Sequence, residues 1–298
     1  MGILPIVLAA LLLEPSSEKL LIIHADDLGN AHATNLAAVE LLDTDSVSSA
    51  SIMMPCAWVN EIADYARKHP EKDLGLHLTL TSEWKYLRWG PVAPKERVPG
   101  LLDPNGYLWP SVPEVAQHAT AAEVEIELRA QIELARKLGI RFTHFDTHMG
   151  TLYARVDYVQ VFEKLGKEYG VPILRLKPTE ASIARAQPEV RKYLLDQEAR
   201  IQKEGHPRLD ALLDNAARGT KTYEERRAAY HKALRELQPG LYMMIIHPAV
   251  FGPELQAMTA TARDRDADYR IFLEPATKQL LKELGIRTIG WKEAAGKP

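Results

Sequence analysis

One cysteine, Cys56, is present among the 298 residues of this sequence. A single cysteine excludes an intramolecular disulfide and a metal site of the CxxC type. Within the segment MMPCAW we expect it to be a small buried apolar residue. The sequence also lacks a long block of lysine and arginine, and its formal net charge is only −3. This charge balance gives no indication of a nucleic-acid partner. Internal repeats and low-complexity tracts are absent too, and the 46% of hydrophobic residues is ordinary for a globular protein.

Long apolar runs are scarce, and the main one lies at the N-terminus, at residues 3–13 (ILPIVLAALLL). It has the length of the apolar core of a signal peptide and is too short to span a membrane comfortably. However, no lysine or arginine precedes it, and the following LLLEPSSEK contains no clear cleavage site of small residues. Two alternatives therefore stay open. Residues 1–18 could be a signal or anchor that directs export, or the protein could be cytoplasmic. We expect no other segment to span a membrane.

Beyond residue 18, short apolar runs alternate with longer segments of helical pattern. The expected strands are 20–24, 49–54, 74–80, 142–147, 173–176, 241–247 and 286–289. The expected helices are 33–42, 58–68, 121–138, 156–169 and 275–284. Strands that are apolar on both faces and alternate with helices predict a parallel α/β architecture. No glycine-rich phosphate turn follows the first strand, and polar clusters recur at several strand ends, so a seven-stranded, distorted (β/α) barrel fits better than a doubly wound sheet.

Two segments interrupt this alternation. Residues 81–118 carry several aromatic residues among prolines and glycines, and residues 180–238 are highly charged and predicted to be mainly helical. Long insertions in a compact domain usually serve as lids or binding loops. We therefore expect one barrel domain over residues 19–298, with inserted lid segments at about 81–118 and 180–238.

Histidines and aspartates lie at the ends of four expected strands. They are His24, Asp26 and Asp27 in the first, His77 in the third, His144, Asp146 and His148 in the fourth, and His247 in the sixth. The three residues of the fourth strand alternate, so they share one face. In a parallel barrel the carboxyl ends of the strands open onto one rim, where side chains from distant segments converge. Buried carboxylates are costly unless a cation or a polar network satisfies them, so the combination predicts a functional site.

Each residue also has an ordinary explanation when taken singly. His77 alone could be a hydrogen-bonded core residue, Asp26 could cap the next helix, and His247 could belong to a loop without a role. The remaining histidines lie in expected helices or charged loops, and we assign them structural roles: His32, His69, His118, His206 and His231.

A set of one aspartate and two histidines suits a divalent metal ion that keeps open positions for water and substrate. Two imidazoles favour Zn²⁺ or another transition metal over Mg²⁺, although Mg²⁺, Mn²⁺ and Co²⁺ are all conceivable. Such an ion can lower the pKa of a bound water and polarise a carbonyl. A general base and a general acid must then come from neighbouring side chains, and Asp26 and His247 suit these two roles.

The segments IIHADDLG, GLHLTLTSEW, THFDTHMGTL and IIHPA, in this order, resemble the YdjC-like carbohydrate deacetylases, which include the chitooligosaccharide deacetylases. The resemblance extends from about residue 20 to residue 291. It implies a distorted seven-stranded (β/α) barrel, one divalent metal ion, and hydrolysis of the acetamide of an N-acetylated sugar or oligosaccharide.

The resemblance also implies residue roles. Asp27, His77 and His148 would be the metal ligands. Asp26 would be the general base and His247 the general acid. Asp146 and Arg175 (in ILRLKP) would orient the ligands or the base. His24 stands where many members have asparagine, and we assign it a supporting role behind the ligands.

The aromatic residues of 81–118 can be interpreted in two ways. Trp84, Trp89 and Trp109 could stack on sugar rings or could pack the long segment against the barrel.

The same rim of histidines and aspartates would also suit a metal-dependent barrel hydrolase of a different bond, such as a phosphoesterase or an amidohydrolase. A non-catalytic carbohydrate-binding relative with this fold is a further possibility, because fold alone does not determine function. A homo-oligomer is compatible with the sequence.

Overall fold

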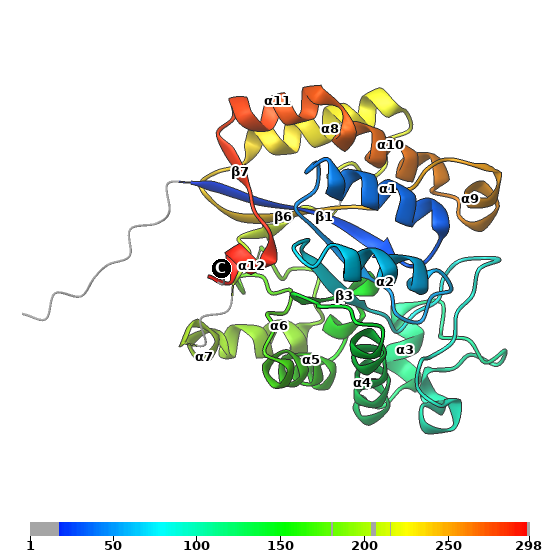
Figure 1. Ribbon diagram of the computed structural model, residues 1–298. Coiled ribbons are helices and arrows are strands. Elements are labelled where there is room, and N and C mark those ends of the chain that lie inside the picture. The colour runs from blue at the N-terminus through cyan, green and yellow to red at the C-terminus, as the bar shows by residue number, and fades with distance from the viewer. Residues whose placement is uncertain (1–17, 180, 204–206, 215, 297–298) are drawn as a thin grey trace, which may run out of the picture.

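The computed structural model describes residues 18–179, 181–203, 207–214 and 216–296 (Figure 1). Two predictions fall outside these residues: the signal or anchor over residues 1–18, apart from Glu18 itself, and the structural role of His206. Within the described ranges, no helix combines the length and the apolar character needed to cross a bilayer.

The strands of the described chain form one sheet in which every pairing is parallel. They are β1 (Lys19–Leu28), β2 (Ser49–Ile52), β3 (Leu74–Leu78), β4 (Phe145–Thr147), β5 (Ala211–Leu212), β6 (Gly240–Ile246) and β7 (Ile286–Thr288). Their order is β4-β3-β2-β1-β6-β5, and β7 pairs with the first three residues of β1. The long β1 is therefore the strand around which the sheet is built.

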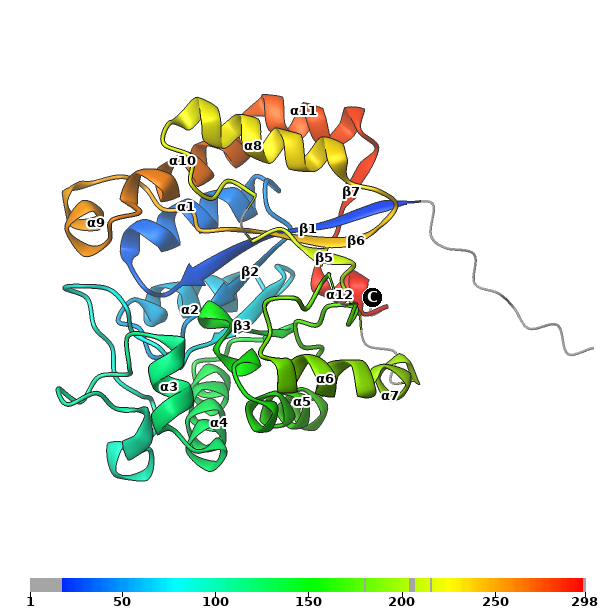
Figure 2. The same cartoon turned by 180° about the vertical axis from the view of Figure 1, so that it is seen from behind.

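The two ends of this strand order are joined by the segment 173–176. The Leu174 N–H donates to the carbonyl of Phe145 in β4 at 2.7 Å, and the Leu209 N–H, just before β5, donates to the carbonyl of Arg175 at 2.9 Å. These bonds close a distorted barrel of parallel strands, with helices around its outside (Figures 1 and 2). The predicted α/β barrel is confirmed.

Helices surround the sheet on its outside, except for the last one (Trp291–Ala294), whose Trp291 packs in the cluster inside the barrel. The α-helices are α1 (His32–Asp43), α2 (Val59–Lys68), α3 (Val112–His118), α4 (Ala121–Lys137), α5 (Val156–Tyr169), α6 (Pro188–Asp196), α7 (Glu198–Lys203), α8 (Tyr223–Glu236), α9 (Pro253–Met258), α10 (Ala262–Leu273), α11 (Pro275–Glu283) and α12 (Trp291–Ala294). The five predicted helices are all present. Two of them end before Gly139 and Gly285, whose φ values of 77° and 63° allow the chain to turn into the next segment.

The insertions differ from prediction in one respect. Residues 180–238 contain α6, α7 and α8, as predicted, but also the short strand β5. A strand of two residues gives no alternation that sequence reading could detect. Conversely, the predicted strand 173–176 makes only isolated bridges, at Ile173 and Leu176. Residues 81–118 form two 3-10 turns, Lys95–Arg97 and Pro99–Leu101, followed by α3.

Side-chain alternation along β1 directs polar groups into the barrel. Leu21 and Ile23 belong to the outer core beneath the helices, whereas Ile22 packs inside the barrel in a cluster that includes Trp291. Because alternate residues of a strand share a face, His24 follows Ile22 into the barrel interior. The polar residues near the end of β1 therefore lie above an apolar floor.

Asp73 fixes the base of the barrel. Its carboxylate accepts hydrogen bonds from the hydroxyls of Ser49 and Thr143 and from the Lys292 backbone N–H. Burial favours the neutral acid, but the interaction with His144 and these hydrogen bonds outweigh it and lower the pKa of Asp73 to about 2. The carboxylate thus joins β2, β3, the start of the fourth strand and α12.

We predict that the Asp73→Asn substitution destabilises the protein by about 2 kcal/mol at pH 7. The folded pKa lies below the ordinary value of 3.8, so this stabilisation is complete above about pH 4 and declines as the pH falls towards 2. Urea unfolding of both proteins between pH 7 and pH 3 measures the difference. The exposed Asp64→Asn variant is the control, and an equal effect of the two substitutions at pH 7 would contradict the prediction.

Candidate metal centre and active site

An unusual backbone turn places adjacent aspartates in one site. Asp27 has a φ of 71°, and the pairing of β1 with β2 shifts register between Ala25 and Leu28. A regular strand would point Asp26 and Asp27 to opposite faces. The left-handed residue instead lets both carboxylates approach the same histidine, with Asp26 Oδ2 at 3.7 Å and Asp27 Oδ1 at 3.6 Å from His77 Nε2. Such strain in a non-glycine residue is typical of functional sites.

Three buried donor atoms converge at this point from β1, β3 and the end of β4. His148 Nδ1 lies 3.2 Å from His77 Nε2 and 3.4 Å from Asp27 Oδ1. Together with the 3.6 Å between His77 and Asp27, these distances outline a small triangle. The three predicted ligand residues are thus brought together, and each side chain is at least nine-tenths buried.

The triangle fits a divalent ion by its spacing and its chemistry. Bonds of about 2.1 Å to nitrogen and oxygen donors in a tetrahedral site place neighbouring donors about 3.4 Å apart. Asp27 Oδ1 is buried and has no hydrogen-bond partner among the described residues. A buried carboxylate oxygen without a partner is costly, and a cation between the three donors would satisfy it.

Each histidine of the triangle is held from behind by a carboxylate. The His77 Nδ1–H donates to Asp146 Oδ1 at 2.7 Å, and the His148 Nε2–H donates to Glu83 Oε2 at 3.0 Å. This leaves one nitrogen of each ring facing the triangle, which is the usual arrangement behind metal-binding histidines. Burial would lower the pKa of His148, but Glu83 and Asp27 outweigh it and raise that pKa to about 10, so a bound ion would have to displace a proton from this ring. Sequence reading missed Glu83, because it lies in an irregular segment rather than at a strand end.

Arg265 in α10 binds the other oxygen of Asp27. Its guanidinium donates to Asp27 Oδ2 at 2.7 Å and lies over the ring of Trp84, 5.0 Å from the ring centroid. Although burial favours the neutral acid, the Arg265 charge lowers the pKa of Asp27 well below its usual range. Asp27 is therefore ionised, with one oxygen occupied and the other facing the triangle. No pattern in the sequence indicated this arginine, which lies 238 residues away along the chain.

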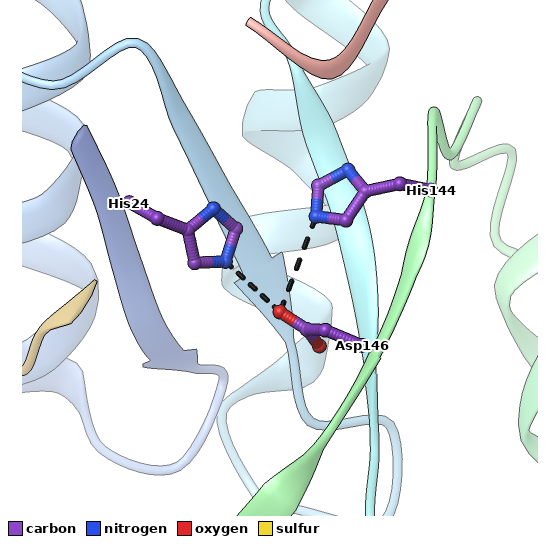
Figure 3. A group of neighbouring side chains, drawn as sticks. All are labelled: His24, His144 and Asp146. Carbon is purple, nitrogen blue, oxygen red and sulfur yellow. Dashed lines mark ion pairs between the residues drawn. The ribbon is translucent and has the colours of Figure 1, made fainter. Parts of the chain in front are cut away.

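A polar network beneath the triangle fixes Asp26. His24 Nε2 lies 3.1 Å from Asp26 Oδ1 and 3.0 Å from Asp146 Oδ2, and the Ser51 hydroxyl donates to Asp26 Oδ1 at 3.4 Å. Figure 3 shows His24 and His144 pointing at Asp146 from either side. Burial would lower the pKa of His24, but the two aspartates outweigh it and raise the pKa to about 9. A cationic His24 thus links Asp26 to Asp146, which in turn holds His77.

His247 lies across Asp26 from this network. Its Nε2 is 4.0 Å from Asp26 Oδ2, and 40% of its side chain is exposed. The His247 backbone N–H donates to Asp268 Oδ2 at 3.1 Å, which fixes the end of β6 against α10. Asp26 Oδ2 therefore lies between His77 on one side and an accessible imidazole on the other.

Among the other predicted residues, Trp89 has its ring centroid 6.3 Å from that of His148. Arg175 forms an ion pair with Glu163 of α5 at 3.0 Å. Trp84 and Trp89 are each 5% exposed, and the ring of the half-buried Trp109 stacks on His118 at 4.5 Å. These positions agree with a packing role for the tryptophans. Cys56 is buried, as predicted.

Comparison with known proteins agrees with this architecture. A carbohydrate deacetylase from Thermus thermophilus is 32% identical over 265 residues, which are 89% of this chain and 90% of the relative. A chitooligosaccharide deacetylase from Yersinia enterocolitica is 25% identical, over 91% of this chain and 97% of the relative.

A solved structure has the same fold. The crystal structure of an Enterococcus faecalis protein, proposed to cleave cellobiose phosphate, superposes with a TM-score of 0.75 at 24% identity. The superposition covers 93% of this chain and 99% of that protein. The family model described as YdjC-like protein matches residues 20–283. This chain therefore belongs to the YdjC-like family.

Proposed function

We propose that this protein is a metal-dependent carbohydrate N-deacetylase, a hydrolase that removes the acetyl group from an N-acetylated sugar or oligosaccharide. The observation that carries this proposal is the triangle of Asp27, His77 and His148, with the Asp26 carboxylate beside it and the His247 imidazole beyond. The names of the relatives from Thermus thermophilus and Yersinia enterocolitica support the same activity.

Asp27, His77 and His148 would hold one divalent ion through Oδ1, Nε2 and Nδ1. Two imidazoles favour Zn²⁺, with Mg²⁺, Mn²⁺ and Co²⁺ as alternatives. When bound, the ion lowers the pKa of a water molecule and polarises the acetamide carbonyl. Asp146 and Glu83 keep the two imidazoles in the orientation and tautomer that bind a cation.

Asp26 has the geometry of a general base. Its Oδ1 is anchored by His24 and Ser51, while Oδ2 faces the site. A carboxylate held through one oxygen leaves the other free to accept the proton of the attacking water. The water then forms a bond to the acetamide carbon, and the tetrahedral carbon releases the amine.

His247 has the position of a general acid. It lies opposite the anchored side of Asp26 and is accessible, so a leaving nitrogen could reach its ring. The imidazolium would donate its proton to this nitrogen as the carbon–nitrogen bond breaks, which yields acetate and a free amino sugar. The backbone contact with Asp268 keeps the ring at the mouth of the site.

A hydrolase with two metal ions is the second candidate. Asp26, His77 and Asp146 place a further set of donor atoms within 4.8 Å of one another. Asp146 and Asp26 already interact with His24, whose positive charge opposes a second cation at this point. The hydrogen bonds that Asp26 accepts from Ser51 and Asp146 from His77 likewise favour a single ion.

The proposed base and ligand can be separated by substitution. We expect Asp26→Asn to lower kcat by about 10²–10⁴-fold with the ion still bound, because an amide cannot accept the proton. We expect Asp27→Asn to lose both the ion and the activity. Acetate release from N-acetylglucosamine oligomers and ion content after gel filtration are the measurements. Asp157→Asn, in a surface ion pair, is the control. Full ion content with full activity in Asp27→Asn would refute the assignment.

Glu83 is predicted to strengthen ion binding through His148. The Glu83→Gln substitution keeps a hydrogen-bond acceptor but removes the charge, so we expect affinity for the ion to fall by about tenfold or more. Competition with a chromophoric chelator measures this affinity. Glu71→Gln, which alters the surface pair with His69, is the matched control. Equal affinities for both variants would show that Glu83 has no such role.

A further inference from the structure

Exposed apolar side chains gather on the face of the barrel that carries the site. Several of them follow the carboxyl ends of strands: Trp58 after β2, Tyr86 after β3, Met149 after β4 and Phe251 after β6. This is the side to which the arrowhead of β1 points, with α9 and the loops of 81–111 around it (Figures 1 and 2). Exposed apolar groups concentrated beside a polar site are typical of a ligand-binding surface.

Trp58 carries the largest ring among these groups. It is 38% exposed, and its backbone N–H donates to the carbonyl of Gly29 at 2.9 Å, two residues beyond the metal-site residue Asp27. The ring of His32, the first residue of α1, packs on its indole with centroids 4.9 Å apart and planes 30° apart. Glu61 holds His32 at 2.7 Å, so the pair forms a fixed and accessible aromatic surface.

This surface continues along the first turns of α1. Leu36 is 48% exposed and lies one helical turn after His32, on the same face. On the other flank, the Val250 N–H donates to the carbonyl of Ala33 at 3.0 Å, which brings Phe251 next to α1. We call Trp58, His32, Leu36 and Phe251 the rim shelf.

The rim shelf is connected to the metal-site residues on both flanks. On one flank, the backbone of Trp58 is bonded to Gly29, close to Asp27. On the other flank, the Ala249 N–H donates to the carbonyl of Arg265 at 3.2 Å, and the Arg265 side chain binds Asp27. The backbone that carries the shelf is therefore hydrogen-bonded on both flanks to segments that carry residues of the site.

The chemistry of the rim shelf suits a sugar ring. One face of a pyranose consists of C–H groups that pack on an aromatic ring, and its hydroxyls can meet polar groups at the edge. His32 and Glu61 supply such groups, and the Arg263 guanidinium lies over the Phe251 ring, 5.1 Å from its centroid. Four side chains cover far less area than the roughly 800 Å² per partner of a stable protein–protein interface.

We propose that the rim shelf binds a sugar unit adjoining the one that is deacetylated, with Trp58 as its main stacking surface, so that the enzyme prefers oligosaccharides. This inference rests on the proposed function. Trp84 and Trp89 are buried, and Trp109 is stacked on His118. The stacking role is therefore assigned to Trp58, an exposed tryptophan of the β2–α2 connection, instead of to these three.

The test is a comparison of kcat/KM across N-acetylglucosamine oligomers of one to five units. For Trp58→Ala we expect a loss of about five- to tenfold on the longest oligomers and little change on the shortest accepted one. Trp58→Phe should keep most of the preference because it retains a ring. Leu195→Ala, an exposed apolar residue of α6, is the matched control and should leave all values unchanged.

The outcomes separate this inference from the proposed function. No acetate from any oligomer with the wild-type protein would refute the proposed function itself. Suppose that the wild-type protein is active, and that Trp58→Ala leaves kcat/KM unchanged or lowers it equally for all oligomer lengths. This result would refute the role of the rim shelf. If Trp58→Ala does not fold, the same comparison with Phe251→Ala decides, and a loss of kcat/KM that is absent or equal for all oligomer lengths would overturn the proposal.

Discussion

Burial of the Asp27 carboxylate beside two imidazoles is the constraint on which the rest of the site depends. Water cannot solvate these groups, so each must find a partner within the protein. Arg265 neutralises one side of Asp27, while Glu83 and Asp146 fix the outer nitrogens of His148 and His77. What remains is one carboxylate oxygen and two ring nitrogens facing one another, and this arrangement is stable only if a cation or protons lie between them.

The left-handed turn at Asp27 makes this arrangement compatible with a strand. Without it, alternation would send one of two adjacent aspartates out beneath the helices. With it, Asp26 and Asp27 occupy the same site but have different surroundings: the first meets His24 and Ser51, the second Arg265. Different surroundings are what allow two neighbouring carboxylates to take different chemical roles. The register shift in β1 is thus part of the site, and the apolar cluster around Trp291 lies beneath it.

The sequence was sufficient for the barrel and for the residues that gather at its rim. Apolar runs alternating with helices predicted the parallel architecture, and His77 and His148 could be placed because they lie in strand-like segments. It was not sufficient for Glu83 and Arg265, whose contacts depend on an irregular loop and on a helix far along the chain. The strand β5 was missed because two residues carry no periodic signal. Aromatic residues were noticed in 81–118, yet burial rather than composition decides which rings are accessible.

Counting metal ions tests the central claim most directly. Elemental analysis of the purified protein, after dialysis against buffer and reloading with Zn²⁺, should give one ion per chain, and His148→Ala should reduce this to near zero. Two ions per chain would favour the two-metal hydrolase, because the donor set of Asp26, His77 and Asp146 would then hold a second cation. No bound ion in the wild-type protein would contradict the account, since the buried triangle of Asp27, His77 and His148 would then have another purpose.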